Sequence, residues 1–129
     1  MIAALALIAM PTSEAMDFEG PVASIAKCDR TAVTNTVAAA TTRHSDFLLA
    51  SYQEQRAIAV ARVELAERRR VLHAKEAKVD TEQGLTLVAE SLDDRAQALA
   101  DQRALDQAEQ DMMAYFRTQY LRQCSGKAS

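Results

Sequence analysis

The chain has 129 residues and a formal net charge of −3 at pH 7, and its length fits one small domain. A charge this close to neutral argues against a general nucleic-acid-binding protein, which normally carries a basic surface. Hydrophobic residues make up 49% of the chain, but aromatic residues make up only 5% and tryptophan is absent. Alanine is abundant, and it favours helix while burying little area, so the composition predicts slender, closely packed helices.

The first fifteen residues have features of a signal peptide. An apolar run from Ile2 to Met10 precedes Pro11, and the small residues Ser13 and Ala15 suit a cleavage site. The run is too short for a transmembrane helix, which needs about 20 apolar residues. Residues 1–15 are therefore predicted to be removed on export to the periplasm or the cell exterior, leaving a mature chain with no transmembrane segment. A buried helix is the alternative, because no basic segment precedes the run.

Helix-breaking residues are rare in the rest of the sequence. Between Val22 and Cys124 there is no proline, and Gly84 is the one glycine. A sandwich or barrel needs many turns, which proline and glycine usually make. The fold class is therefore predicted to be all-α, a single domain over residues 16–129. Its helices are expected at about 22–33, 42–79 and 85–123.

Two sets of aliphatic residues recur at heptad steps, which places each set on one stripe of a helix. Their members are Ile58, Leu65, Leu72 and Val79, followed by Leu85, Leu92 and Leu99. The polar stretch from Asp80 to Gly84 separates them and is predicted to form a helix–helix turn. Folding the chain about Glu82 gives three layers, which are Val79 with Leu85, Leu72 with Leu92, and Leu65 with Leu99.

The charges of the two segments are complementary. Residues 56–78 include seven basic and three acidic side chains, and residues 80–111 include nine acidic and two basic ones. Opposite charge favours this pairing, although an exposed ion pair contributes only about 0–1 kcal/mol. The sequence therefore predicts a long antiparallel, coiled-coil-like hairpin. A continuous helix in a parallel homodimer is the alternative, but the step from Val79 to Leu85 breaks the heptad phase.

The two cysteines predict a disulfide and a third helix. Cys28 and Cys124 lie near opposite ends of the mature chain, and a bridge closing a loop of roughly 100 residues stabilises by about 4–5 kcal/mol in the chain-entropy model. Pairing about Glu82 leaves them about 18 Å apart along a straight helix. A reversal near Thr34-Asn35-Thr36 closes that gap, so a short N-terminal helix is predicted to pack on the open end of the hairpin. Unpaired thiols and an intermolecular bridge are the alternatives.

The same pairing gathers most aromatic and methionine side chains of the mature chain at the open end. They are Phe47, Tyr52, Met112, Met113, Tyr115, Phe116 and Tyr120. Because methionine adapts to varied surfaces, this set is a candidate surface for a protein partner or an apolar ligand. An ordinary core beneath the N-terminal helix is the alternative.

No group of residues has a pattern typical of catalysis, metal binding or cofactor binding. His44 and His73 lie about 43 Å apart on one predicted helix, too far to share a metal ion. Arg68-Arg69-Arg70 point in three directions, and nothing apolar surrounds Asp93-Asp94 to shift a pKa. The sequence therefore predicts a protein that is not an enzyme and needs no cofactor.

These observations favour an exported interaction or scaffold protein of the cell envelope, such as a subunit of a secretion or surface assembly. Its hairpin is expected to bind another protein or a second copy of itself, and no nucleic acid. A small periplasmic chaperone-like protein, or one that binds an apolar ligand at the aromatic and methionine residues, is the alternative. No motif in the sequence identifies a family.

Overall fold

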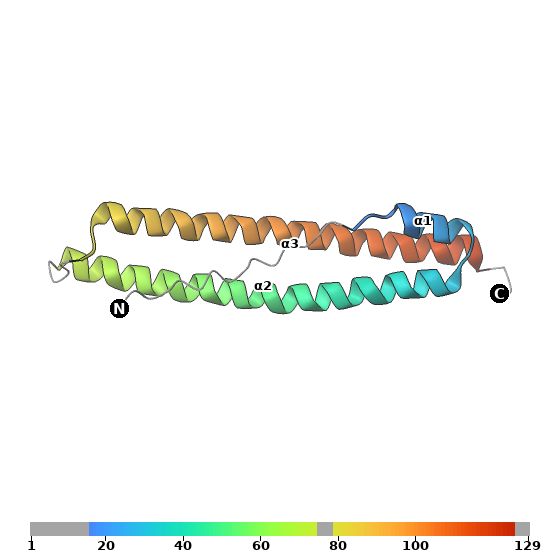
Figure 1. The fold of residues 1–129 in the computed structure, drawn as a ribbon, viewed down its shortest axis with the longest axis horizontal. Helices are drawn as coiled ribbons and strands as arrows, with labels where there is room; N and C mark the ends of the chain where they lie inside the picture. The colour runs from blue at the N-terminus through green and yellow to red at the C-terminus, as the bar shows by residue number, and fades with distance from the viewer. Residues whose placement is uncertain (1–15, 75–78, 126–129) are drawn as a thin grey trace. The chain divides into compact units, whose positions relative to one another are not determined.

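The computed structural model describes residues 16–74 and 79–125. These residues form three helices and no strand, namely α1 (Glu19–Ala26), α2 (Arg30–His73) and α3 (Glu82–Cys124) (Figure 1). The predicted all-α fold class is confirmed. Within the same ranges, no helix combines the length and the hydropathy needed to cross a membrane. The predicted signal peptide, residues 1–15, lies outside the described residues.

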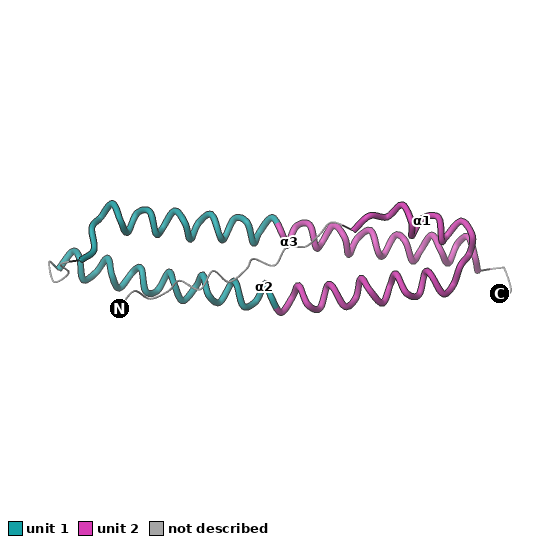
Figure 2. Tube along the Cα trace, viewed as in Figure 1, with its two compact units in different colours: residues 1–11, 50–101 teal, residues 12–49, 102–129 magenta. Residues whose placement is uncertain are grey.

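The chain divides into two compact units (Figure 2). Of the described residues, one unit comprises 50–74 and 79–101 and is named here the turn unit. The other comprises 16–49 and 102–125 and is named the disulfide unit. Helices α2 and α3 each contribute a segment to both units, whereas α1 belongs to the disulfide unit alone.

An aliphatic cluster joins α2 to α3 in the turn unit. Leu65 of α2 is buried with Leu85 and Leu92 of α3. The smaller or partly buried residues around them are Ala61, Leu72, Val88 and Ala89. The buried residues recur at the heptad step expected from the sequence, so these members of the predicted stripes form the interior of this unit. They are Ile58 and Leu65 of α2 and Leu85, Leu92 and Leu99 of α3.

All three helices contribute to the core of the disulfide unit. Ile25 of α1 is buried with Val33 and Ala40 of α2 and with Met113 and Phe116 of α3. The predicted disulfide is present at one end of this core. The Sγ atoms of Cys28 and Cys124 are 2.05 Å apart, and their Cα atoms are 5.6 Å apart. The unit is therefore held by a mixed apolar core and a covalent link between the chain before α2 and the end of α3.

The chain reverses between α1 and α2 around Cys28. The N–H of Cys28 donates to the carbonyl of Ile25 at 2.9 Å, and the N–H of Asp29 donates to that of Ser24 at 3.0 Å. This is a Schellman motif, and Cys28 occupies its left-handed position with φ of 49°. Asp29 then caps α2, because its Oδ1 accepts a hydrogen bond from the N–H of Ala32 at 3.1 Å.

The predicted reversal at Thr34-Asn35-Thr36 is wrong, and so is the predicted helix at 22–33. Helix α2 runs through this segment without a break. The hydroxyl of Thr36 donates to the carbonyl of Ala32 at 2.9 Å, which satisfies it inside the helix instead of ending the helix. The reversal at Cys28 takes the place of the predicted one.

The turn between α2 and α3 begins and ends earlier than predicted. Helix α2 spans Arg30–His73 instead of 42–79, and α3 begins at Glu82 instead of 85. Thr81 caps α3, because its Oγ1 accepts a hydrogen bond from the N–H of Gly84 at 3.0 Å. Gly84 therefore lies in the first turn of α3, and not at the end of the connecting segment.

The predicted pairing about Glu82 is wrong. Val79 is 92% exposed, so it does not form an interior layer. Pairing about Glu82 would place His44 opposite Tyr120, but in the disulfide unit His44 contacts Asp106 at 2.8 Å. Asp106 lies two heptads before Tyr120 in the chain. Each apolar stripe therefore still faces the other helix, but the facing residues differ from the predicted ones.

Leu85→Ala is expected to destabilise the protein by about 2–5 kcal/mol, because it leaves a cavity beside Leu65 and Leu92. Leu85 is only 1% exposed, whereas the neighbouring Leu87 is 60% exposed. Leu87→Ala is therefore the matched control and is expected to change the unfolding free energy by less than about 0.5 kcal/mol. Urea unfolding followed by circular dichroism measures both values, and equal losses would contradict the described burial.

Candidate functional site

The structure separates the predicted aromatic and methionine surface into interior and exposed residues. Those buried in the disulfide unit are Phe47, Met113 and Phe116. Tyr120 packs against the same core. The exposed members are Met112 and Tyr115 of the disulfide unit and Tyr52 of the turn unit. Most of the set thus serves the core, as in the alternative considered above, and the surface is smaller than predicted.

A groove between α1 and α3 includes Met112 and Tyr115. Its volume is about 340 Å³. The wall from α1 and the residue before it consists of Phe18, Val22, Ile25 and Ala26. The wall from α3 consists of Met112, Tyr115, Phe116, Gln119 and Gln123. Val22 is 57% exposed and Tyr115 is 59% exposed, so the groove is an open apolar surface with a buried floor.

The two ends of the groove differ in polarity. Helices α1 and α3 both run toward the disulfide, so Phe18 and Met112 lie at the opposite end. Exposed carboxylates flank these two residues in the chain, namely Asp17, Glu19 and Asp111. The end nearer the disulfide has the neutral amides of Gln119 and Gln123. The groove therefore has apolar walls, and at one end its lining residues have acidic neighbours in the chain.

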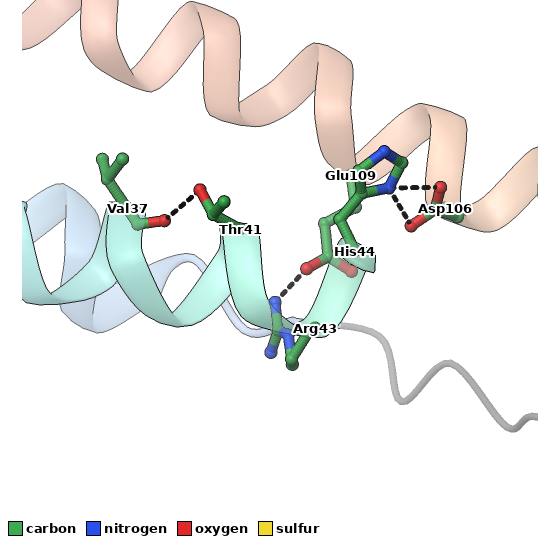
Figure 3. Close-up of polar contacts among 6 residues, drawn as sticks. All are labelled: Val37, Thr41, Arg43, His44, Asp106 and Glu109. Carbon is green, nitrogen blue, oxygen red and sulfur yellow. Dashed lines mark hydrogen bonds and ion pairs between the residues drawn. The ribbon is translucent and has the colours of Figure 1, made fainter. Parts of the chain in front are cut away.

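Polar side chains of α2 pair with carboxylates of α3 in the disulfide unit (Figure 3). His44 Nδ1 lies 2.8 Å and 3.0 Å from the two carboxylate oxygens of Asp106. Arg43, the preceding residue, donates to the carboxylate of Glu109. Asp106 and Glu109 are both buried, so α2 supplies a partner for each carboxylate that α3 places in the interior.

A further buried pair lies in the turn unit. Arg95 Nε of α3 donates to Glu54 Oε1 of α2 at 2.8 Å. The Glu54 side chain is almost fully buried, and its second oxygen, Oε2, has no hydrogen-bond partner among the described residues. A buried acceptor left in this state costs about 1–3 kcal/mol. This unpaired oxygen reduces the net stability that the pair contributes.

Arg68 binds the segment that leads into α3. Its Nη2 and Nε donate to Asp80 Oδ1 and Oδ2 at 2.6 Å and 3.1 Å. These hydrogen bonds, together with the charge of Arg68, hold the pKa of Asp80 below its ordinary value of 3.8 and raise the pKa of Arg68. This bidentate pair fastens the chain immediately before the Thr81 cap.

Three of the remaining charged candidates, Arg70, Asp93 and His73, have separate structural partners. Arg70 donates to Glu67 on its own helix, which lowers the pKa of Glu67. Arg62 reaches Asp93 at 3.2 Å across the two helices. His73 lies 3.7 Å from Glu82. In the part of the chain that the structure describes, no group of three or more possible ligands could hold a metal ion.

Sequence reasoning missed the residues that α1 contributes to the groove. The sequence predicts a helix at 22–33 with its reversal at Thr34-Asn35-Thr36, so it does not place Val22 and Ile25 on a short separate helix beside α3. The available signal was the pair Cys28-Asp29, in which Asp29 is a good cap for a helix that begins at the next residue.

Comparison of the chain with models of protein families, with curated proteins and with solved structures gave no match.

Arg95→Leu is expected to destabilise the protein by about 2–3 kcal/mol, because it leaves the Glu54 carboxylate buried without a cation. Glu54→Leu combined with Arg95→Leu is expected to recover that loss, since two apolar side chains replace the pair. Chemical unfolding of the three proteins with the disulfide intact measures the difference. A double variant no more stable than the single one would show that the pair itself supplies net stability.

Asp80→Asn is expected to lower the unfolding free energy at pH 7 and to have no effect in strong acid. The folded state lowers the pKa of Asp80, so its contribution is complete above pH 3.8 and is lost as the pH falls through the lowered value. Urea unfolding between pH 7 and pH 2 measures the difference between variant and wild type, with Asp94→Asn, an exposed carboxylate of α3, as control. A difference that stays constant with pH would rule out this linkage.

Proposed function

We propose that this protein is an exported, non-enzymatic interaction protein of the cell envelope whose α1–α3 groove binds an apolar segment of another protein. The groove is the observation that carries the proposal. Exposed apolar side chains are usually scattered singly over a soluble protein. Here Val22, Met112 and Tyr115 gather around one hollow of about 340 Å³.

The walls of the groove define the chemistry of the partner. Helix α1 has eight residues, so the groove is about 12 Å long. That length accommodates about two turns of a helix or a few residues of an extended strand. The carboxylates of Asp17, Glu19 and Asp111 at one end attract a basic side chain. The expected partner segment therefore has two or three apolar side chains followed or preceded by lysine or arginine.

We infer that α2 and α3 present this groove on an antiparallel coiled-coil hairpin. Heptad burial on both helices supports the inference, as do the pairs that cross between them within each unit. In the turn unit, residues later in α2 meet residues earlier in α3, as Glu54 meets Arg95 and Arg62 meets Asp93. A hairpin of this kind is a common support for protein recognition, including in secretion and surface assemblies.

Export is supported by the chemistry of the cysteines. Disulfides form and persist mainly in oxidising compartments such as the periplasm and the cell exterior. Cys28 and Cys124 form such a bond, and it lies at one end of the proposed binding site. The apolar run and small residues within 1–15 support the same proposal.

A small apolar ligand is a second candidate occupant. The groove volume of about 340 Å³ falls at the lower end of the range typical of ligand pockets, which is roughly 300–1,000 Å³. In this case the amides of Gln119 and Gln123 would bind a polar head group. The same groove therefore serves either occupant, and binding experiments distinguish them.

A photocrosslinking residue at Tyr115 is expected to capture one defined envelope protein in the native host, through an apolar segment next to lysine or arginine. Mass spectrometry identifies the crosslinked peptide. Val22→Asp is expected to abolish the product, because it places a charge in the groove. The matched control carries the photocrosslinker at Val63, which is 72% exposed in the turn unit.

Identical products from the Tyr115 and Val63 positions would contradict a specific groove. The absence of any product, combined with binding of a neutral apolar dye that Val22→Asp removes, would favour the small-ligand candidate.

A further inference from the structure

We infer that the α1–α3 groove is a redox-dependent binding site, complete only while Cys28 and Cys124 are joined. This inference rests on the proposed function of the groove and adds its regulation. Helix α1 and the residue before it provide four of the nine lining residues, so the site loses one wall when α1 leaves α3.

Helix α1 is weak on its own. It has eight residues, fewer than the roughly 12–15 that an isolated helix needs to be even marginally stable in water. Gly20 and Pro21 stand in its first turn, and glycine is a poor helix former. Ile25 is its one buried residue. The side-chain hydrogen bonds described for α1 are local, as from the Ser24 hydroxyl to the Gly20 carbonyl. The apolar contact that holds α1 in place therefore consists of Ile25, with Met16 and Phe18 packed beside the same core, and it stabilises this wall of the groove only weakly.

The disulfide attaches α1 covalently to α3. Cys28 follows α1 after one residue, and its partner Cys124 is the last residue of α3. The bond therefore fixes the end of α1 to the end of the opposite wall. Cys28 also has φ of 49°, a left-handed conformation that residues other than glycine adopt at a cost. Without the disulfide, the left-handed conformation at Cys28 loses a covalent constraint that stabilises it.

The chemical step is reduction by a dithiol. The dithiol gives up two electrons and two protons and becomes a disulfide, while the Cys28–Cys124 bond breaks and each sulfur takes one hydrogen. The reverse exchange, with a disulfide as oxidant, closes the bond again. A chain with reduced cysteines thus lacks a formed groove, and oxidation after export completes it, so that the partner is bound only in an oxidising compartment.

The test measures binding of the neutral dye N-phenyl-1-naphthylamine to oxidised protein, dithiothreitol-reduced protein and the Cys28→Ser/Cys124→Ser variant. Groove binding is defined as the part of the fluorescence signal that Val22→Asp removes, since detachment of α1 also exposes core residues of α3. Val63→Asp, in the turn unit, is the matched control. Reduction and the double serine variant are both expected to weaken groove binding more than about tenfold, because only a small fraction of the chain retains the binding-competent form.

Hydrogen exchange provides a second measurement that does not depend on the dye. On reduction, the amides of residues 19–26 are expected to lose protection while those of residues 85–101 keep it. Groove binding that is equal in oxidised and reduced protein would overturn the redox dependence and leave the proposed function intact. Absence of groove binding in the oxidised protein would overturn both. Loss of protection throughout α3 would overturn a selective effect on α1.

Discussion

The partners of the buried charges determine how α2 and α3 are paired. Aliphatic stripes with a heptad repeat leave this pairing open, because sliding one helix by whole heptads brings stripe back against stripe. A buried carboxylate leaves no such freedom, since its cost depends on whether a cation or hydrogen-bond donor faces it. Pairing about Glu82 places Asp106 opposite Ile58 and Glu54 opposite Gln110. In the structure, Asp106 meets His44 and Glu54 meets Arg95.

Composition and periodicity were sufficient to predict several features, although Val79, which also stands at a heptad step, is exposed. Scarce glycine and proline predicted the all-α class, heptad steps predicted the buried positions of Leu65, Leu85 and Leu92, and the even cysteine count predicted the bond. The pairing was not predicted because three aliphatic layers looked sufficient, although the clash of Ile58 with Asp106 already argued against them. Asp106 was therefore more informative than any single leucine.

The errors near the chain reversals have local causes. Thr34-Asn35-Thr36 resembles a helix break, but the Thr36 hydroxyl bonds to the backbone one turn earlier and the helix continues. Cys28 makes a left-handed C-terminal reversal that usually requires glycine, so sequence propensity gave no warning of it. The predicted aromatic and methionine surface includes Tyr52, which belongs to the turn unit, and omits Val22, which lines the groove of the disulfide unit.

The groove depends on the same charge-directed pairing. Within the disulfide unit, His44 with Asp106 and Arg43 with Glu109 fix the position of α3 beside α2. That position brings Cys124 to Cys28, and the bond in turn holds α1 along Met112 and Tyr115. A shift of α3 by one heptad would move Cys124 by about 10 Å, beyond the reach of a disulfide, and α1 would lose its covalent anchor. The side-chain pairs of the disulfide unit therefore also position, through the disulfide, the α1 wall of the proposed site.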